Sequence, residues 1–307
     1  MIPPSCEAQL ISSANRVISA VCRKRMGAMK HSPASEVDFV ASLIENGVDM
    51  LEREWKRVLA PMGVDVGVAG VFCHQSPKVT IHGPPPPRAK TLSCELADLL
   101  VLHSHGTATH KVFHRATLVQ AKMYFGSPVS PDEPQFWLYD TWPSFSIRAP
   151  GFDPRLRDFE GDDRSGRYGL VSNAHWKITL PVNPLVAHSH LSLDFGTFLV
   201  RMLYDMDPAQ PRRTSSHGRQ VYHNSSKDWS NTVWEIVEVT GKLALKHMGK
   251  KKGLYPTVLP TRIGGHVLAF LTEQSKSYVI PPTPTEEVGA GPGGLSIFHI
   301  STLELEG

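Results

Sequence analysis

The sequence lacks several features that define protein classes. No apolar run approaches the roughly 20 residues that span a bilayer, and no charged stretch followed by an apolar core opens the chain, so we expect neither a membrane span nor a signal peptide. The four cysteines, Cys6, Cys22, Cys73 and Cys94, show no CxxC spacing. We therefore expect reduced thiols in a cytoplasmic protein, without a disulfide framework or a cysteine-ligated zinc site.

Common catalytic motifs and a strong charge bias are also missing. Neither G-x-S-x-G nor a P-loop occurs, which argues against a serine hydrolase or a P-loop NTPase. The net charge of +3 over 307 residues does not by itself require a nucleic-acid partner. Hydrophobic residues make up 41% and charged residues 20%, which is typical of a globular protein with a sizeable core.

The order of periodic segments predicts an α/β or α+β fold. Helical spacing of apolar residues predicts helices over 7–26, 32–59, 192–206 and 228–248. Apolar runs predict strands over 64–74, 96–102, 117–123 and 295–305, a strand or short helix over 135–147, and a polar loop over 150–167. No linker divides the chain, so we expect one domain over 1–307, with a core over about 34–145 and a helical and β elaboration over 150–307.

Three polar residues interrupt two of these apolar runs. Asp98 lies within "LADLLVL", and Gln120 and Lys122 lie within "TLVQAKM". A carboxylate in a strand covered on both faces costs several kcal/mol unless it is paired or bound to a cation. Gln120 and Lys122 are two residues apart, so they point to the same side of a strand. One reading is a buried Asp98–Lys122 ion pair without activity, but such pairs seldom stabilise a fold, which favours a function.

The pattern resembles that of the PD-(D/E)xK nuclease superfamily, which has the restriction-endonuclease-like fold. There, an acid on the second strand and a (D/E/Q)xK element on the third form the active site. Here Asp98 is followed by Gln120-Ala121-Lys122, and a helix and a strand precede them. The phrases "VFCHQSPKV", "CELADLLVL", "LVQAKM" and "QFWLYDTWPSF" are similar to those of bacterial nuclease-like proteins found near defence genes. The resemblance covers residues 34–145 and implies a central mixed sheet flanked by helices.

The resemblance implies a Mg²⁺- or Mn²⁺-dependent endonuclease, with a role as an effector in anti-phage defence. Asp98, the side-chain oxygen of Gln120 and the backbone carbonyl of Ala121 would hold the metal ion, and Lys122 would orient water or stabilise charge on the phosphorus. Gln120 stands where the family usually has an acid, and a neutral amide supplies no charge. A catalytically inactive nuclease fold that binds nucleic acid or serves in an assembly is therefore the alternative.

Further residues could complete this site. The family often supplies another glutamate from the first helix, which here favours Glu36 or Glu45, although either could belong to a solvated helix face. Glu95 faces away from Asp98 on a regular strand and becomes a ligand only if the strand begins with a bulge. His74 and Gln75 end the first strand and either border the site or belong to a loop.

A histidine-rich stretch offers a competing interpretation. "HSHGTATHKVFH" contains His103, His105, His110 and His114, and imidazoles are common zinc ligands. His-Ser-His also resembles the core of JAMM-type zinc peptidases, but the Ser-x-x-Asp element of that family is absent. The HxHxDH motif of metallo-β-lactamase-like hydrolases is absent too. A zinc hydrolase is therefore the lesser alternative, and polar residues on a hairpin are the simpler interpretation.

Two basic segments gain interest if the substrate is a polyanion. Each is otherwise an ordinary solvated loop. The candidate phosphate contacts are Arg212, Arg213, Arg219, Lys250, Lys251 and Lys252. The expected partners are nucleic acid, with DNA favoured, and a regulatory protein or a second copy of the chain, because the sequence shows no evident sensor domain.

Overall fold

The computed structural model describes residues 2–28, 35–73, 76–83, 92–106, 112–187, 191–204, 217–222, 225–248, 278–280 and 294–305. For 25–28, 242–248 and 278–280 it describes the backbone alone.

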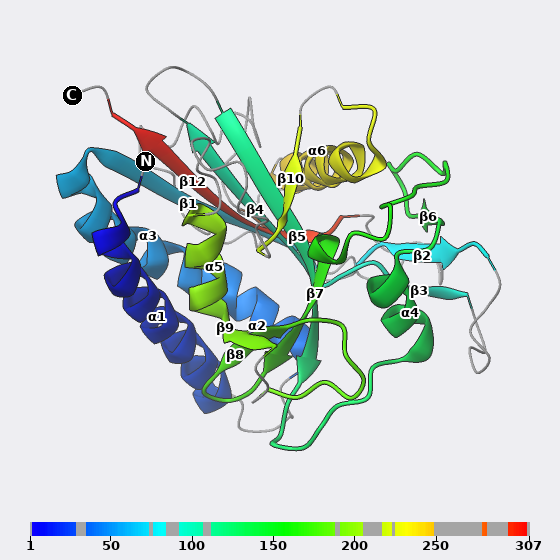
Figure 1. The fold of residues 1–307 in the computed structure, drawn as a ribbon, viewed down its shortest axis with the longest axis horizontal. Coiled ribbons are helices and arrows are strands. Elements are labelled where there is room, and N and C mark those ends of the chain that lie inside the picture. Colours follow the sequence, from blue (N-terminus) through cyan, green and yellow to red (C-terminus); the bar gives the residue numbers. More distant parts are fainter. Residues whose placement is uncertain are drawn as a thin grey trace.

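A large mixed sheet runs through the molecule (Figure 1). Its strands lie in the order β11-β1-β12-β4-β5-β7-β8-β9, and β10 pairs additionally with β5. Their bounds are β1 Val64–Cys73, β4 Leu99–Gly106, β5 Val112–Met123, β7 Gly166–Val171, β8 Trp176–Thr179, β9 Ser192–Asp194, β10 Arg219–Val221, β11 Tyr278–Ile280 and β12 Ser296–Glu304. β12 is antiparallel to β1 and parallel to β4, β4 is antiparallel to β5, and β5 is parallel to β7.

Four helices cover one face of this sheet. They are α1 Glu7–Ala28, α2 Glu36–Ser42, α3 Val48–Leu59 and α5 Phe195–Tyr204. A π-helical turn over Leu43–Gly47 joins α2 to α3, so the predicted helix over 32–59 forms as one run that begins at Glu36. Ser35 caps its start, because its side chain accepts from the Asp38 amide and the Asp38 carboxylate accepts from the Ser35 amide. This cap fixes the first turn of α2, which begins at Glu36.

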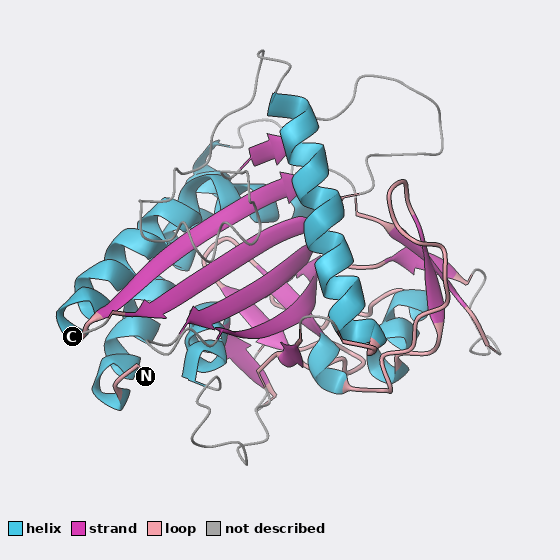
Figure 2. Cartoon of the chain, turned by 90° about the horizontal axis from the view of Figure 1, so that it is seen from above, coloured by secondary structure: helices cyan, strands magenta, loops and turns pink. Residues whose placement is uncertain are grey.

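The opposite face is covered by α4 Glu133–Thr141, α6 Asp228–Met248 and a small sheet in the order β3-β2-β6 (Figure 2). The small sheet consists of β2 Lys78–Ile81, β3 Ser93–Glu95 and β6 Phe145–Arg148. Short 3-10 turns occur at Pro4–Cys6, Ala60–Met62 and Asp163–Ser165. Each face of the large sheet has its own cluster of buried apolar residues, so the sheet separates two cores.

The mixed α/β architecture agrees with the fold class predicted from the sequence. The large sheet also draws strands from outside residues 34–145, the range over which we expect the core. β7 and β8 extend the same sheet, and β12 lies between β1 and β4 at its centre. The segment over 135–147 contains a helix, α4, followed by the strand β6. None of the helices in the described part of the chain combines the length and the apolar character needed to cross a bilayer.

Candidate active site

The candidate site lies where β5 runs on past the start of β4. Leu99, the first residue of β4, pairs with Val119, so residues 120–123 extend beyond β4 while remaining paired with β7. Successive residues of a strand direct their backbone groups to alternate edges. The Tyr124 amide donates to the Val171 carbonyl on the β7 side, whereas the Ala121 and Met123 amides donate to carboxylates on the other side. Along this edge, acidic side chains therefore accept the hydrogen bonds that a neighbouring strand would otherwise accept.

Asp98 and Glu36 provide these carboxylates. Oδ2 of Asp98 accepts the Ala121 amide at 2.7 Å and Nε2 of Gln120 at 2.5 Å. Oε1 of Glu36 accepts the Met123 amide at 3.0 Å. The two acceptor sites are two strand residues apart, about 7 Å along β5. The fold thus brings an acid from the β3–β4 connection and an acid from the start of α2 to the edge of the strand that carries Gln120.

Burial changes the acidity of Asp98. Its side chain is about 9% exposed, and its pKa is raised to about 7, foremost because burial disfavours the charged form. The neighbouring charges of Glu95 and Glu36 raise this pKa further, whereas the Ala121 hydrogen bond and the charge of Lys122 lower it. Asp98 therefore changes its ionisation near neutral pH, as a proton-exchanging or cation-binding group requires.

Gln120 and Lys122 lie on one face of β5, as their spacing predicts. Leu118 belongs to the core cluster beneath α4 and α6, whereas Val119 and Ala121 belong to the cluster beneath α1 and α3. Nζ of Lys122 lies 3.9 Å from Oδ2 of Asp132, a side chain that is 84% exposed. An exposed partner at that distance holds the ammonium group weakly, so Lys122 can turn to another anion.

The oxygen donors at this edge suit a divalent cation. Oε1 of Gln120 is buried and has no hydrogen-bond partner among the described residues. Rotating this amide by half a turn would direct the oxygen toward Asp98. The Ala121 carbonyl shares the edge of its own amide. Carboxylate, amide and carbonyl oxygens are the ligands that Mg²⁺ takes. Within the described ranges, no group of three or more His, Cys, Asp or Glu side chains forms a metal site, so neutral oxygens would complete the set.

The other predicted acids lie apart from this edge. Glu45 is exposed on the π-helical turn, so of the two helix glutamates only Glu36 reaches β5. Glu95 is exposed at the end of β3, and it acts on Asp98 through its charge. His74 and Gln75 fall outside the described residues.

Two tyrosines near the site are not predicted from the sequence. Tyr168 pairs with Gln120 across β5 and β7, and its buried hydroxyl has no hydrogen-bond partner within the part of the chain that the structure describes. Its ring centroid lies 5.3 Å from that of Tyr139 on α4. The Tyr139 hydroxyl donates to the Leu96 carbonyl at 2.8 Å, two residues before Asp98. No local signal reveals either contact, because both depend on elements that are distant in the sequence.

The histidines do not converge on one point. His103 and His105 both bond Oγ1 of Thr302, through Nε2 at 3.2 Å and Nδ1 at 2.9 Å. Nε2 of His105 also lies 3.5 Å from Glu304. Burial lowers the pKa of His105 to about 4 and that of His103 well below its usual value, so both imidazoles are neutral at pH 7.

His114 lies elsewhere in the sheet. Its Nδ1 and Nε2 of His299 both bond the Ser104 hydroxyl, at 2.8 and 3.0 Å. Ser104 and His103 are consecutive strand residues and point to opposite faces. Within the described residues, these histidines form no group of three or more side chains that could hold a metal ion. His110, the fourth histidine of the histidine-rich stretch, lies outside these residues.

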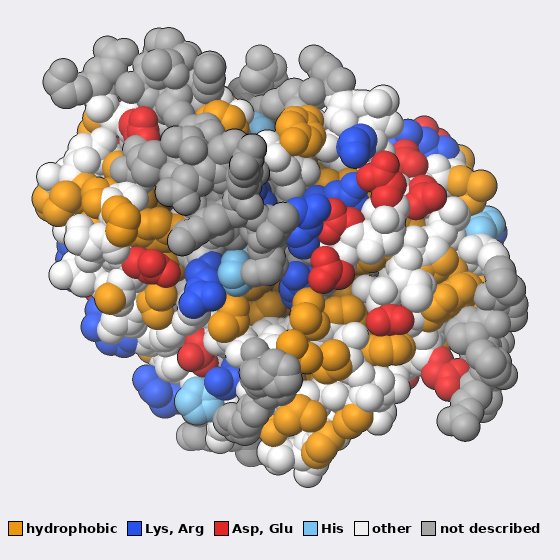
Figure 3. Space-filling view, viewed as in Figure 1, with side chains coloured by type: hydrophobic (Ala, Val, Ile, Leu, Met, Phe, Trp, Pro, Cys, Tyr) orange, Lys and Arg blue, Asp and Glu red, His pale blue; other side chains and the backbone are white. Residues whose placement is uncertain are grey.

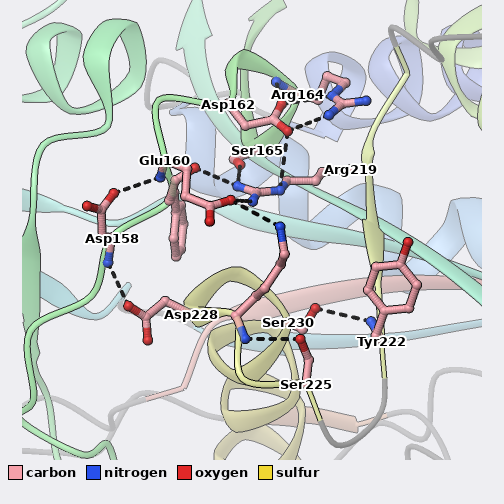
Figure 4. A network of polar contacts seen from close by, with 12 residues as sticks. Asp158, Glu160, Asp162, Arg164, Ser165, Arg219, Tyr222, Ser225, Asp228 and Ser230 are labelled. Atoms are coloured by element: carbon pink, nitrogen blue, oxygen red, sulfur yellow. Dashed lines mark hydrogen bonds and ion pairs between the residues drawn. The ribbon is translucent and has the colours of Figure 1, made fainter.

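Arg219 lies within a network of polar contacts (Figure 4). Its guanidinium donates to the Phe159 carbonyl at 2.6 Å and to Glu160 at 2.9 Å, and it lies 3.3 Å from Asp162. The residue is 7% exposed. Acceptors within the protein therefore occupy the donors of Arg219, and the phosphate contact at this residue stays a prediction. The other predicted phosphate contacts, Arg212, Arg213, Lys250, Lys251 and Lys252, fall outside the described residues.

A comparison of the chain with protein families, curated proteins and solved structures finds no match. The function is therefore inferred from the residues at the edge of β5.

Proposed function

We propose that this protein is a metal-dependent nuclease that hydrolyses phosphodiester bonds in nucleic acid, with DNA favoured. One observation supports the proposal above all. Asp98 and Glu36 bind the amides of Ala121 and Met123, two residues apart on the strand that carries Gln120 and Lys122. The arrangement is similar to that expected for a PD-(D/E)xK site: an acid beside the second strand of the motif, a QxK element on the third, and a glutamate from the preceding helix.

The proposed mechanism assigns a role to each of these side chains. Asp98, Gln120 and the Ala121 carbonyl would hold Mg²⁺ or Mn²⁺, with Glu36 as a further carboxylate. When bound, the cation would neutralise charge on the phosphate and lower the pKa of the attacking water. Lys122 would donate to a non-bridging phosphate oxygen and stabilise the charge that develops there.

The raised pKa of Asp98 fits this role. A neutral Asp98 is a poor cation ligand, and a pKa of about 7 leaves the group ready to exchange its proton for a cation at physiological pH. Burial thus keeps a large share of Asp98 protonated near pH 7 until a cation arrives.

The surface is compatible with a polyanionic partner without demanding one. The face shown in Figure 3 carries Lys and Arg side chains across its middle, interspersed with Asp and Glu. We propose that Arg212, Arg213 and Lys250 to Lys252 add phosphate contacts, and that a regulatory protein or a second copy of the chain controls activity, consistent with an effector role in anti-phage defence. The proposed location is the cytoplasm.

Incubating the purified protein with plasmid and with single-stranded DNA tests the nuclease proposal. Each substrate is combined with Mg²⁺, Mn²⁺ or EDTA, and Asp98→Asn serves beside the wild type. We expect cleavage that needs a divalent cation and is lost in the variant. Wild-type cleavage rates in Asp98→Asn would remove these residues from the active site.

A second candidate, an inactive nuclease fold that binds nucleic acid or acts in an assembly, is favoured by one observation. Nε2 of Gln120 donates to Asp98 at 2.5 Å, so the amide and the carboxylate satisfy each other without a cation. Binding of nucleic acid in EDTA, with no cleavage in any metal and no change in Asp98→Asn, would select this candidate.

A further inference from the structure

A cavity opens directly beyond the candidate site. Its volume is about 340 Å³, within the range of small-ligand pockets. We name it the β5–β7 pocket, since it lies where β5 and β7 end. Its walls include residues 123–126, which follow Lys122 along the chain, and the turn between β7 and β8. Met123 joins the two sites, because it lines the pocket while its amide is bound by Glu36.

The floor of the pocket continues the row that holds Lys122. Leu170 pairs with Lys122 across β5 and β7, and Lys177 pairs with Leu170 across β7 and β8. Residues paired in this way point to the same face of a sheet. Leu170 and Lys177 both line the pocket. Two ammonium-bearing residues therefore stand two strands apart, about 10 Å, with an apolar floor between them.

The lining combines the groups that recognise a nucleotide. Phe125 is 79% exposed, an unusual position for a phenylalanine side chain, and Tyr124 lies beside it. Aromatic faces stack on unpaired bases without regard to sequence. Asn173 and His175 provide polar groups at the opposite wall. This composition suits a flat ring with polar edges better than a purely apolar ligand.

The polar wall is held in place before any ligand binds. The Ser172 hydroxyl accepts the His175 amide at 3.1 Å, and the Ser172 amide donates to the His175 carbonyl at 2.8 Å. These bonds close the β7–β8 turn. Lys177 lies 3.3 Å from Asp194, which is 47% exposed, so the ion pair is weak and a phosphate can replace it.

We propose that the β5–β7 pocket accommodates the base of an unpaired nucleotide next to the scissile phosphate, so that the substrate is single-stranded or locally unpaired nucleic acid. This inference rests on the proposed nuclease function, which places the scissile phosphate at Asp98 and Lys122. The nucleotide's base stacks on Phe125, and its other phosphate lies toward Lys177. A base inside an intact duplex cannot enter the pocket without leaving its partner.

Binding in EDTA tests the pocket separately from cleavage. A labelled single-stranded DNA and its duplex are titrated by fluorescence anisotropy against the wild type, Phe125→Ala and Tyr222→Ala. Tyr222, which is 49% exposed and does not line the pocket, provides a matched aromatic control. We expect the single strand to bind more tightly than the duplex, Phe125→Ala to weaken it about tenfold or more, and Tyr222→Ala to leave it unchanged.

Abasic nucleotides sharpen the assignment. An abasic site is moved along the single strand, one position per oligonucleotide. If the pocket holds a base, one position loses affinity for the wild type but none for Phe125→Ala, since the stacking partner is already gone. Equal affinity for single strand and duplex, or a Phe125→Ala variant that binds as the wild type does, would overturn the proposal.

The outcomes separate this proposal from the nuclease proposal. Metal-dependent cleavage that is lost in Asp98→Asn, with equal use of single strand and duplex and no effect of Phe125→Ala, overturns the pocket and leaves the nuclease standing. Single-strand binding in EDTA that depends on Phe125, without cleavage in any metal, supports the pocket and removes the nuclease. Unchanged thermal unfolding of Phe125→Ala verifies that the variant is folded.

Discussion

Oδ2 of Asp98 receives both the Ala121 amide, at 2.7 Å, and Nε2 of Gln120, at 2.5 Å. One oxygen atom therefore makes both hydrogen bonds that hold this side chain. An asparagine at position 98 would offer its amide oxygen to the same two donors without carrying a charge. The fold requires an acceptor at this position, and only a function requires an acid.

The first prediction follows for the stability of Asp98→Asn. At pH 8 and without divalent metal, we expect the variant to unfold at a higher temperature than the wild type. The pKa of about 7 implies a cost of ionising the buried Asp98, at most about 4 kcal/mol at pH 8. Thermal unfolding followed by circular dichroism measures the difference.

The pH dependence provides the internal control. Because the folded-state pKa of Asp98 is raised above the ordinary value of 3.8, the folded protein holds this proton more tightly than the unfolded chain does. The resulting stability is complete below about pH 4 and is lost as the pH rises through 7. The advantage of Asp98→Asn should therefore shrink from pH 8 to pH 5. A lead that stays constant with pH would show that Asp98 is not neutral in the fold.

The second prediction concerns cation binding and pH. If Mn²⁺ displaces the proton of Asp98, apparent affinity should fall about tenfold for each pH unit below 7 and level off above it. Isothermal titration calorimetry in two buffers of different ionisation enthalpy also counts the released proton. Asp98→Asn is the control and should bind Mn²⁺ weakly at every pH. Affinity that does not change between pH 5.5 and 8 would exclude Asp98 as a ligand.

The sequence predicts the faces of β5 but not that β7 and β10 pair with it. Alternation assigns Gln120 and Lys122 to one face and Val119 and Ala121 to the other, because this period is local. The strand predicted over 96–102 begins only at Leu99, which places Asp98 at the point where pairing with β5 begins. Asp98 therefore lies one residue before the start of β4, and not inside the strand.

The order of the strands in the large sheet cannot be predicted from local sequence patterns. β12 enters between β1 and β4, although nearly 190 residues separate it from β4 in the chain. The segment that forms β7 shows no clear alternation of apolar and polar residues. The sequence therefore does not predict that Tyr168 pairs with Gln120. The basic run that contains Arg219 predicts a solvated surface that could contact phosphates. In the structure, acidic residues from 158–165 form ion pairs with the Arg219 side chain inside the protein. Such contacts depend on tertiary structure.

The third prediction distinguishes the two helix glutamates. Glu36→Gln should lower Mn²⁺ affinity and cleavage, because it removes a carboxylate at the edge of β5. The amide oxygen can still accept from Met123, so the fold should persist. Glu45→Gln, on the exposed π-helical turn, is the matched control and should behave as the wild type does. Equal behaviour of the two variants in metal titrations would place Glu36 outside the site.

The fourth prediction concerns Arg219. Arg219→Ala should destabilise the protein by about 1–3 kcal/mol, because it leaves the Phe159 carbonyl without its buried donor, whereas Asp162 keeps its ion pair with Arg164. Urea unfolding measures this change, and Arg148→Ala, at an exposed position, is the control. The salt dependence of nucleic-acid binding should not change in Arg219→Ala at temperatures where it is folded. A flatter slope would return Arg219 to the phosphate contacts.

The last prediction concerns Gln120, an amide at a position where the proposed nuclease site would usually have an acid. Gln120→Glu places a second carboxylate beside Asp98, and like charges in a buried site repel. Without metal, we expect the variant to unfold at a lower temperature at pH 8 than the wild type, since it loses the hydrogen bond from Nε2 to Asp98. With saturating Mn²⁺ the order should reverse, because a doubly acidic site binds the cation more tightly and binding stabilises the folded state. Gln220→Glu, on the short strand β10, controls for the added charge. If Mn²⁺ stabilises Gln120→Glu no more than it stabilises the wild type, Gln120 does not contact the cation. The inactive nuclease fold is then the better supported of the two candidate functions.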